Sequence, residues 1–512
     1  MSELRFEALY YPERLRLVNM TGDVGIITLW TQLPVAERRL ASISADLLDP
    51  GRSRIAVVAN LYGDGMYAMF CNLLYNPQIR YLVALGQRLG QTTTDELQAF
   101  LDHGLEETDL LGTRLTRITG TSRYFPTGSD FPAERLRSQI TFRAFGDFSD
   151  PRLAEELIDY LEGLPRAPTP GESDRIRVMH SPTTPAEFAV RPSSAHSHEV
   201  SRARPLECWR ELVTRVMRFG RPVPVGSGTR LELLNVKAVV THPVVERVEA
   251  LAQYGFELDR LLAYQRDMLR SGLPAGVTYT YGNRMRGYIG DGRPAYDALR
   301  AAADLLAADP HSRHAYVDLW DTKVDLEDAG SVPCLTTLFF RVSEEHLTLS
   351  ATYRAHNLLI AWIQNIYGLM AIQSYVAESV GLPIGPITVL SHSLGIDPSS
   401  SRYPLGRAIA NDWDTDDDLD PDTGRHVLRA DPNGYFVIKA DEDSIVAEHR
   451  YDGLLLKQYR AKRAAIIERQ IISDHAVSLV SHAIWVGRQL ERAENELRDR
   501  GTRPSPARWD DT

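Results

Sequence analysis

The sequence predicts a multidomain protein in which an α/β domain is followed by an α+β domain and a small α+β unit. Its 512 residues are too many for one ordinary hydrophobic core. Strand-type runs alternate with helix-type segments near the N-terminus, whereas hairpin patterns combine with helices in the rest of the chain. Residues 164–204, which are rich in Pro, Ser, Thr and Arg, separate the two patterns and are predicted to form a linker or arm.

Residues 1–163 are predicted to form the α/β domain. The apolar runs RIAVVANL (54–61) and RYLVALG (80–86) are typical of buried strands. Between them, residues 66–77 have helical spacing and end at a proline. Residues 92–104 form a second amphipathic helix pattern that starts with threonines and ends with glycine. The strand–helix–strand order favours parallel pairing of the strands.

Residues 205–400 are predicted to form the second domain. Three helix patterns in it end at Gly or Asp-Pro, and they cover 205–220, 257–272 and 293–310. The runs LTTLFFRV (335–342) and HLTLSATY (346–353) are expected to pair as a hairpin. A helix is predicted over 357–379, of which residues 357–377 carry no charge. Its length would allow it to span a membrane, but its amide side chains are costly in lipid, so we expect a helix buried in a soluble core.

The acidic residues of 401–430 are predicted to form a surface linker, and residues 431–512 a third unit. Alternating aspartates in 411–424 resemble a calcium-binding loop, but the glycine and glutamate that such a loop requires are missing, so no metal is expected. In the third unit, 434–440 and 444–451 are expected to form a hairpin. A long amphipathic helix over 474–501 is expected to follow it.

Composition limits the partners and the compartment. The net charge of −11 argues against a nucleic-acid-binding protein, because such proteins carry a basic surface. The three cysteines are widely spaced, which is typical of a reducing compartment and not of a disulfide framework or a zinc site. The segment MSELRFEALYYPERLRL carries charges throughout and shows no secretory signal. A cytoplasmic protein that contacts neither nucleic acid nor membrane is therefore expected.

Three residues in the second domain suggest a nucleotide site. The thiol of Cys334 can add to an electron-poor ring, as in nucleophilic catalysis. The guanidinium of Arg354 suits a phosphate, and the amide of Asn365 can both donate and accept on a base edge. Asn357 and Asn365 are eight positions apart, which would place them near one side of the predicted helix. The alternatives are a packed strand cysteine, a structural ion pair and buried amides that bond only the backbone.

Five motifs in this region resemble, in order, those of the thymidylate synthases and related pyrimidine nucleotide hydroxymethylases. The resemblance covers about residues 205–397, and five motifs in the family's order are far more specific than any one of them. The motifs are GSGTR (226–230), YGNRMR (281–286), DPHSRH (309–314) with Leu319-Trp320, VPCL (332–335), and YRAHN (353–357) with Asn365.

The resemblance implies an α+β domain with a mixed sheet and a homodimer that transfers a one-carbon unit to C5 of a pyrimidine nucleotide. It implies that Cys334 attacks C6, that Tyr281 helps to remove the C5 proton, and that Glu257 is the catalytic glutamate. It also implies that Arg313 reaches the partner's site in the dimer. The remaining substrate-binding residues are implied to be Arg354, Asn365, Asn357, Arg230 and His392. The donor would be 5,10-methylene-tetrahydrofolate or a tetrahydromethanopterin analogue.

Several motif positions depart from the family pattern. Leu335 replaces the histidine that follows the nucleophile, and His314 replaces the second arginine of its motif. Gly226 stands where the family has an arginine, and no tyrosine follows His392 at the step of the family's sugar-binding motif. Methylation of dUMP is the leading interpretation. A (d)UMP or (d)CMP hydroxymethylase, or a non-catalytic nucleotide- or pterin-binding scaffold, are the alternatives.

The flanking regions resemble other families. Residues 54–145 are similar to the corrinoid-carrying component of tetrahydromethanopterin S-methyltransferase. In that family a histidine ligates the cobalt, but here Gln91 stands at its position, so no cobamide is predicted. Residues 431–496 resemble an uncharacterised domain that accompanies methyltransferase-like regions.

Overall fold

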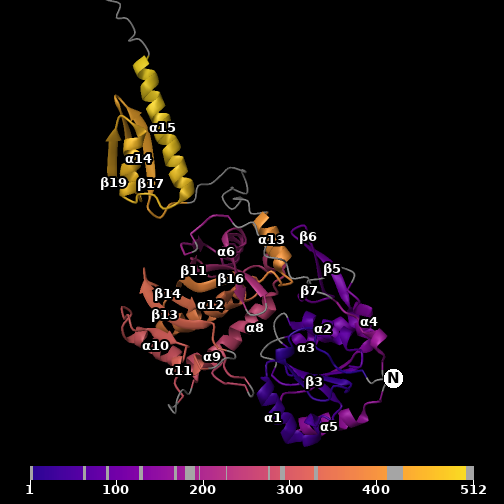
Figure 1. The fold of residues 1–512 in the computed structure, drawn as a ribbon. Helices are drawn as coiled ribbons and strands as arrows, with labels where there is room; N and C mark the ends of the chain where they lie inside the picture. Colours follow the sequence, from indigo (N-terminus) through magenta and orange to yellow (C-terminus); the bar gives the residue numbers. More distant parts are fainter. Residues whose placement is uncertain are drawn as a thin grey trace, which may run out of the picture. The chain divides into compact units, whose positions relative to one another are not determined.

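The computed structural model divides the chain into two compact units, Met1–Asp412 and Trp413–Thr512, which are considered separately (Figure 1). It confirms the predicted fold class of α/β and α+β parts. The residues that it describes are 4–61, 65–87, 92–125, 131–166, 170–178, 191–194, 196–225, 228–274, 277–288, 295–327, 332–411 and 430–502.

A five-stranded sheet forms the centre of the N-terminal region, in the order β1-β3-β2-β4-β8. Strands β3, β2, β4 and β8 are parallel, as predicted for the first part of the chain, and β1 is antiparallel. The strands are β1 (Leu15–Leu17), β2 (Val24–Ile27), β3 (Ile55–Ala59), β4 (Tyr81–Ala84) and β8 (Thr141–Ala144).

Helices cover both faces of this sheet (Figure 1). Of the five helices in this region, the second, third and fourth along the chain pack on one face of the sheet, and the first and fifth pack on the other. The helices are α1 (Leu33–Ile43), α2 (Gly65–Tyr75), α3 (Thr93–His103), α4 (Ala133–Gln139) and α5 (Leu153–Gly163). A separate small antiparallel sheet contains β5 (Leu105–Leu110), β6 (Thr113–Ile118) and β7 (Tyr124–Phe125).

An eight-stranded mixed sheet forms the middle region, with the main order β10-β11-β16-β14-β13-β12. Strand β9 pairs parallel with β11, and β15 pairs parallel with β16. The strands are β9 (Glu199–Arg202), β10 (Arg221–Val225), β11 (Gly228–Val240), β12 (Tyr316–Asp318), β13 (Leu335–Ser343), β14 (His346–Tyr353), β15 (His356–Asn357) and β16 (Ile384–Ile396). Part of the stretch predicted as a linker, 199–202, is thus a strand.

The predicted hairpin of β13 and β14 is confirmed, and its register positions two candidate site residues. Leu335 pairs with Tyr353, with an irregularity between Leu335 and Thr337. The backbone N–H of Arg354 donates to the carbonyl oxygen of Cys334 at 2.9 Å. The hairpin therefore brings the thiol-bearing residue and the arginine together at one end of the two strands.

The helices of the middle region include the three that the sequence predicts. The third of them begins at Ala298 because the Asp297 side chain accepts a hydrogen bond from the backbone of Arg300. The helices are α6 (Pro205–Phe219), α7 (Val248–Ala252), α8 (Leu258–Met268), α9 (Tyr281–Arg286), α10 (Ala298–Ala308), α11 (Thr322–Asp325), α12 (Ala361–Val380) and α13 (Tyr403–Asn411). Helix α13 lies at the start of the stretch predicted as an acidic linker, of which 412–429 lies outside the described residues.

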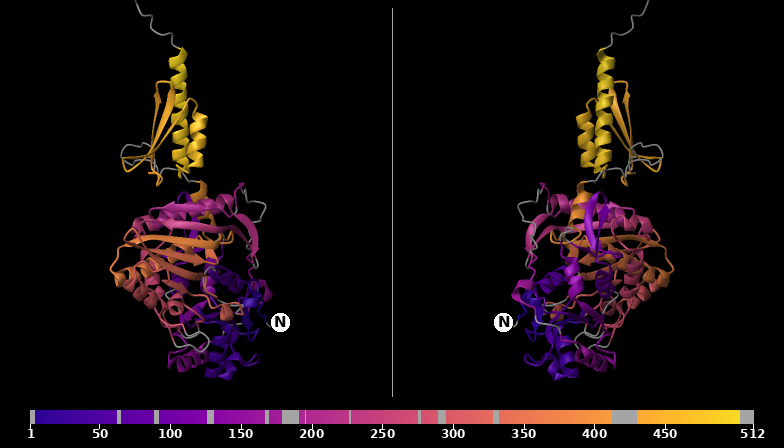
Figure 2. Two further views of the ribbon diagram at one scale, coloured as in Figure 1. Left: turned by 90° about the vertical axis from the view of Figure 1, so that its left-hand side faces the viewer. Right: turned by 90° about the vertical axis from the view of Figure 1, so that its right-hand side faces the viewer.

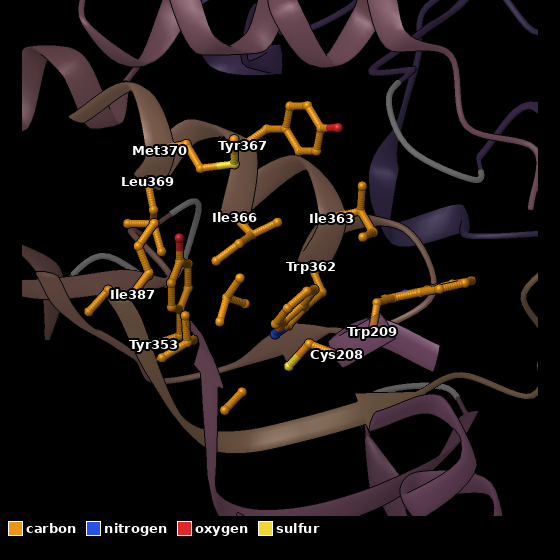
Figure 3. Packing of buried hydrophobic residues seen from close by; sticks show 14 of the residues in the cluster. Cys208, Trp209, Tyr353, Trp362, Ile363, Ile366, Tyr367, Leu369, Met370 and Ile387 are labelled. Atoms are coloured by element: carbon orange, nitrogen blue, oxygen red, sulfur yellow. The ribbon is translucent and has the colours of Figure 1, made fainter. Parts of the chain in front are cut away.

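Helix α12 is the buried helix that the sequence predicts, uncharged as far as Ala377, but it begins later than expected. Figure 3 shows Trp362, Ile366 and Leu369 packed with Tyr353 and Ile387 of the sheet. Residues 356–357 pair with β16 as a strand, so the prediction that Asn357 and Asn365 share one side of a helix is wrong. In the described part of the chain, no helix is long and apolar enough to cross a bilayer.

The N-terminal and middle regions are joined by a buried ion cluster. The carboxylate of Glu96 on α3, with a side-chain exposure of 1%, contacts Arg123 at 2.8 Å and Arg260 of α8 at 2.9 Å. Burial alone would raise the pKa of Glu96, but the charges of Arg123 and Arg260 lower it below its usual value. The cluster ties the helix that carries Tyr264 to the N-terminal sheet domain.

Replacement of Glu96 by glutamine is expected to lower the free energy of unfolding by about 3 kcal/mol, because two guanidinium groups lose a buried partner. Urea unfolding followed by tryptophan fluorescence measures the change. The exposed pair of Glu107 and Arg114 provides the control, since Glu107→Gln should cost less than about 1 kcal/mol. Equal effects of the two substitutions would show that the Glu96 cluster does not hold the structure together.

The C-terminal unit is a three-stranded antiparallel sheet with two helices on one face, as Figure 2 shows. Its predicted hairpin is confirmed, and the structure adds a third strand and a second helix. The Asp431 carboxylate accepts hydrogen bonds from the backbone of Ser478 and Leu479, just before the long helix begins. The elements are β17 (Tyr435–Asp441), β18 (Ser444–Tyr451), β19 (Leu454–Ala461), α14 (Ala464–Ser473) and α15 (Val480–Thr502).

Candidate active site

Cys334 lies half-buried just before β13, and Arg354 is held against the same segment. Arg354 Nε donates to the carbonyl of Pro333 at 2.9 Å, and Nη2 donates to that of Val332 at 3.1 Å. The guanidinium also lies over the Trp320 ring, 5.6 Å from its centroid. These contacts fix the arginine beside the thiol. Among the described residues, Nη1 has no hydrogen-bond partner and can take a ligand.

Arg230 approaches the same place from β11, and a carboxylate already holds it. Its Nε and Nη2 donate to the two oxygens of Asp397 at 2.8 and 2.9 Å, and this pairing raises the pKa of the arginine. The side chain lies directly on Gly395, where any Cβ atom would collide with it. Arg230 therefore remains charged, but part of its field is cancelled by Asp397.

The pKa of the Cys334 thiol reflects two opposing effects. Burial raises the pKa, while the charges of Arg354 and Arg230 lower it, and the net result is a pKa above the usual value of 9.0. The side chain is therefore a neutral thiol in the free protein at neutral pH. A nucleophilic role for this thiol would require a thiolate that forms after a ligand binds or that is present as a small fraction.

The rate of alkylation of Cys334 by iodoacetamide is therefore expected to keep rising as the pH passes 9, because the reactive thiolate accumulates only near its raised pKa. Peptide mapping after pulses from about pH 7 to about pH 10.5 measures this profile for Cys334 alone. The Arg354→Met variant should shift the profile to still higher pH, since one of the two stabilising charges is removed. A rate that levels off below about pH 8 would contradict this assignment.

Three tyrosines lie close enough to the thiol for its charge to affect them, and of these Tyr353 is buried while Tyr264 and Tyr281 are half-buried. Burial raises the pKa of Tyr264, Tyr281 and Tyr353, and each of them is also affected by the charge of Cys334. They come from α8, α9 and β14, so the site is assembled from well separated segments. All three stay protonated at neutral pH and can act there as hydrogen-bond donors.

Asn365 on α12 is held by hydrogen bonds on both sides of its amide. The Tyr264 hydroxyl donates to Oδ1 at 2.8 Å, and Nδ2 lies 2.9 Å from Nε2 of His356. Tyr264 can come this close because α12 has a glycine at the crossing with α8. A Cβ at Gly368 would lie 3.0 Å from the Tyr264 ring.

The structure brings five of the predicted site residues into this region: Cys334, Arg354, Arg230, Tyr281 and Asn365. Asn357 lies nearby on β15, where its side chain accepts a hydrogen bond from the backbone of Ile360. Arg313 is exposed on the loop before β12. Gly226 lies outside the described residues, as does Gln91, on which the expected absence of a cobamide depends.

Two other predicted residues lie away from the thiol. Glu257 precedes the first residue of α8 and pairs with Arg260 at 2.8 Å, about 10 Å along the helix from Tyr264. His392 is exposed and bonds Asn235, and the alternation of strand β16 directs it to the face opposite Ser391. The roles assigned to Glu257 and His392 therefore find no support in the geometry.

Sequence reasoning missed the residues that support the site. Tyr264 belongs to an ordinary amphipathic helix pattern, and Asp397 follows a strand without any motif. His356 and Ser391 are visible in the sequence only as neighbours of Arg354 and His392. Among the described residues, no group of three or more His, Cys, Asp or Glu side chains could hold a metal ion.

Comparison with known proteins places this geometry in a family. The family model for thymidylate synthase matches residues 267–396, which contain Cys334, Arg354 and Asn365. A protein of Methanothermobacter marburgensis named "Putative thymidylate synthase" is 31% identical over 215 residues, which make up 39% of this chain and 93% of that protein. A protein of the same name from Methanopyrus kandleri is 31% identical over 37% of this chain and 88% of its own length.

The chain belongs to the thymidylate synthase family, as the five motifs predicted. A second model, PterinBD-DUF4346, matches residues 430–502, so the C-terminal unit is similar to a pterin-binding domain. The two models leave the N-terminal region uncovered. Its resemblance to a corrinoid-carrying methyltransferase component stays a prediction.

Proposed function

We propose that the protein transfers a one-carbon unit from a methylene-tetrahydropterin to C5 of a uracil nucleotide and thereby methylates dUMP. The observation that carries this proposal is the hairpin register that sets Cys334 beside Arg354, with the charge of Arg230 acting on the same thiol. Asn365 joins this region through its hydrogen bond to Tyr264, which the charge of Cys334 also affects. A thiol, a phosphate-binding guanidinium and a base-reading amide are the groups that this chemistry requires. Family membership supports the same reaction class.

Each residue has a defined task in this reaction. The sulfur of Cys334 bonds to C6 of the base, and the electron pair of the C5–C6 double bond makes C5 a nucleophile. A methylene-tetrahydropterin would supply the one-carbon unit, which bonds to C5 as one of its two bonds to pterin nitrogen breaks. The hydroxyl of Tyr281 relays the C5 proton to water, so that the remaining carbon–nitrogen bond can break and leave an exocyclic methylene on C5. A hydride from the tetrahydropterin would then reduce this methylene to methyl as the C5–C6 double bond reforms, Cys334 departs as the thiolate and the donor departs as the dihydropterin. Nη1 of Arg354 binds the phosphate, while Asn365 binds N3–H and O4.

Two further parts of the proposal concern assembly. The exposed position of Arg313 on the loop before β12 suits an arginine that reaches the phosphate site of a second copy, so we propose a homodimer. Asp397 would compete with a phosphate for Arg230, and therefore Arg354 is the main phosphate ligand.

Product analysis tests this function and separates it from the alternatives. With dUMP and a methylene-tetrahydropterin, we expect thymidylate together with one dihydropterin per product, detected by absorbance and by chromatography of the nucleotide. Hydroxymethyl product with no oxidised pterin would identify a hydroxymethylase instead. Nucleotide binding without product from either tetrahydrofolate or tetrahydromethanopterin donors would favour the scaffold.

The C-terminal unit is proposed to bind the acidic tail of the pterin. A depression of about 420 Å³ between β19 and α14 is lined by three cations and one carboxylate. Lys457 and Arg460 are paired with Asp474 and Asp441, but Arg469 has no ion-pair partner among the described residues of this unit. The tails of tetrahydropterins carry carboxylates or phosphates, which suit this excess of positive charge.

The Arg469→Ala variant of the full chain is expected to bind tetrahydrofolate triglutamate about tenfold more weakly, since one charge-assisted contact is lost. Fluorescence titration measures the dissociation constant at two salt concentrations. Lys462→Ala removes an exposed charge that lies outside the depression and should leave the affinity unchanged. Equal dissociation constants for Arg469→Ala and Lys462→Ala would rule out this depression as the binding site of the pterin tail.

A further inference from the structure

Four polar side chains form one continuous hydrogen-bonded chain behind the base-reading amide. They start at Tyr264 on α8 and continue through Asn365 on α12 to His356 on β15. Nδ1 of His356 then lies 3.0 Å from Oγ of Ser391 on β16. Asn365, His356 and Ser391 are all buried, and His356 is also stacked on Tyr353 with 4.1 Å between ring centroids.

The direction of every bond in this chain is fixed by chemistry. The amide nitrogen of Asn365 can only donate, so Nε2 of His356 must accept and carries no proton. Burial lowers the pKa of His356 to about 3, so the ring is neutral, and its single proton is on Nδ1. That proton is donated to the Ser391 hydroxyl. Tyr264, at the other end, donates its proton to Oδ1.

This arrangement leaves the amide with one free site on each atom. Oδ1 has a second lone pair and Nδ2 a second hydrogen. Together they offer an acceptor and a donor side by side, which matches N3–H and O4 of uracil. Cytosine presents the opposite pattern at N3 and N4, and it could be read only after the amide had turned over.

Turning the amide over would disturb the whole chain. Oδ1 would then face Nε2 of His356, so the imidazole proton would have to move from Nδ1 to Nε2. Ser391 would have to change from acceptor to donor, and the Tyr264 hydroxyl would lose the amide oxygen as its acceptor. A buried donor without an acceptor is unfavourable, so the chain resists reversal.

We propose that His356, held in its Nδ1–H tautomer by Ser391, is the positioning residue that fixes the Asn365 amide and so selects uracil over cytosine nucleotides. This inference rests on the proposed function, because it assumes that Asn365 reads the base. It adds two residues, His356 and Ser391, that need not touch the substrate. The family motifs did not point to either of them as a determinant of specificity.

The Ser391→Ala variant tests the proposal. It removes the acceptor of the Nδ1 proton, so the Nε2–H tautomer and the reversed amide become accessible. The ratio of kcat/KM for dUMP to that for dCMP is expected to fall at least tenfold, and Ser391→Thr should restore it. Tyr264→Phe acts from the other end of the chain and should lower the ratio in the same direction.

A serine–histidine contact elsewhere provides the matched control. Oγ of Ser193 lies 2.9 Å from Nε2 of His198, in a segment that contributes nothing to the chain behind Asn365. Ser193→Ala should leave the dUMP to dCMP ratio as in the wild type. If Ser193→Ala lowered this ratio as much as Ser391→Ala does, the effect would come from general destabilisation of the fold, and the proposal would be overturned.

Nitrogen-15 NMR of the wild-type imidazoles gives a readout that does not depend on any variant. The His356 ring should show a protonated Nδ1 and an unprotonated Nε2 at neutral pH. Protonation at Nε2, or an unchanged specificity ratio in a folded Ser391→Ala protein, would overturn the inference. Failure of the proposed function is distinguishable, because then wild-type protein would form no covalent complex with 5-fluoro-dUMP at Cys334.

Discussion

Replacement of Cys334 by alanine is expected to lower the turnover of dUMP by about four orders of magnitude or more, because the sulfur that bonds to C6 is lost. Steady-state assays with dUMP and a methylene-tetrahydropterin measure the loss. Affinity for dUMP should change by less than about tenfold, since Arg354 and Asn365 remain in place. The effect should thus fall almost entirely on kcat.

Cys71 provides the control for the loss of a thiol. It is buried in the N-terminal region on α2, where burial raises the pKa of the thiol to about 11. A Cys71→Ala protein should keep kcat within about twofold of the wild type, once the concentration of folded protein is corrected. Turnover by Cys334→Ala at more than about one per cent of the wild-type rate would show that the thiol does not carry the reaction.

The Arg354→Met variant is expected to lose about 3 kcal/mol of binding to the substrate phosphate, or roughly a hundredfold in kcat/KM for dUMP. Deoxyuridine lacks the phosphate, so its slow reaction should be much less affected. Comparison of the two substrates in wild type and variant isolates the phosphate contact. Arg354→Lys should recover little, because the planar guanidinium bonds Pro333 and Val332 while it also binds the phosphate.

An equal loss for dUMP and deoxyuridine would contradict the phosphate role of Arg354. It would instead indicate that the guanidinium only holds the segment that carries Cys334. Arg230→Met gives a useful comparison, because Asp397 already occupies two of its nitrogens. Arg230→Met should therefore lower kcat/KM for dUMP less than Arg354→Met does.

Much of the fold could be predicted because the local sequence patterns favour the same helices and strands that pack together in the tertiary structure. The β13–β14 hairpin has strands of alternating burial joined by a short polar turn, and its pairing follows. Helix α10 ends before Asp-Pro as expected. The start of α12 could not be predicted, because residues 356–357 are drawn into the sheet by β16, a strand that comes later in the chain than α12 itself.

The site could be predicted where residues with suitable side chains are close together in the sequence or are joined by one hairpin. Cys334 directly precedes the first strand of one hairpin and Arg354 directly follows the second, so motif spacing is enough to bring them together at its open end. The sequence indicates Asn365 as a candidate base reader, but it does not indicate the direction of its amide. That direction depends on Tyr264 and Ser391, which belong to α8 and β16 and lie far from it in the sequence.

The departures from the family pattern also have structural consequences. Leu335, which replaces a histidine, is completely buried opposite Tyr353 and can exchange no proton with substrate. Arg230, the first arginine after Gly226, crosses strand β16 at Gly395 and bonds Asp397, so part of its charge is already neutralised.

Covalent attack by Cys334 on the base is tested most directly by intact-mass spectrometry of the protein after incubation with 5-fluoro-dUMP and a methylene-tetrahydropterin. The fluorine cannot leave as a proton does, so the bond between sulfur and C6 should persist. We expect the mass of the wild type to rise by the sum of nucleotide and pterin, peptide mapping to assign the addition to Cys334, and the mass of Cys334→Ala to stay unchanged. An unmodified wild-type mass with both tetrahydrofolate and tetrahydromethanopterin donors, or an addition at any other residue, would contradict this expectation.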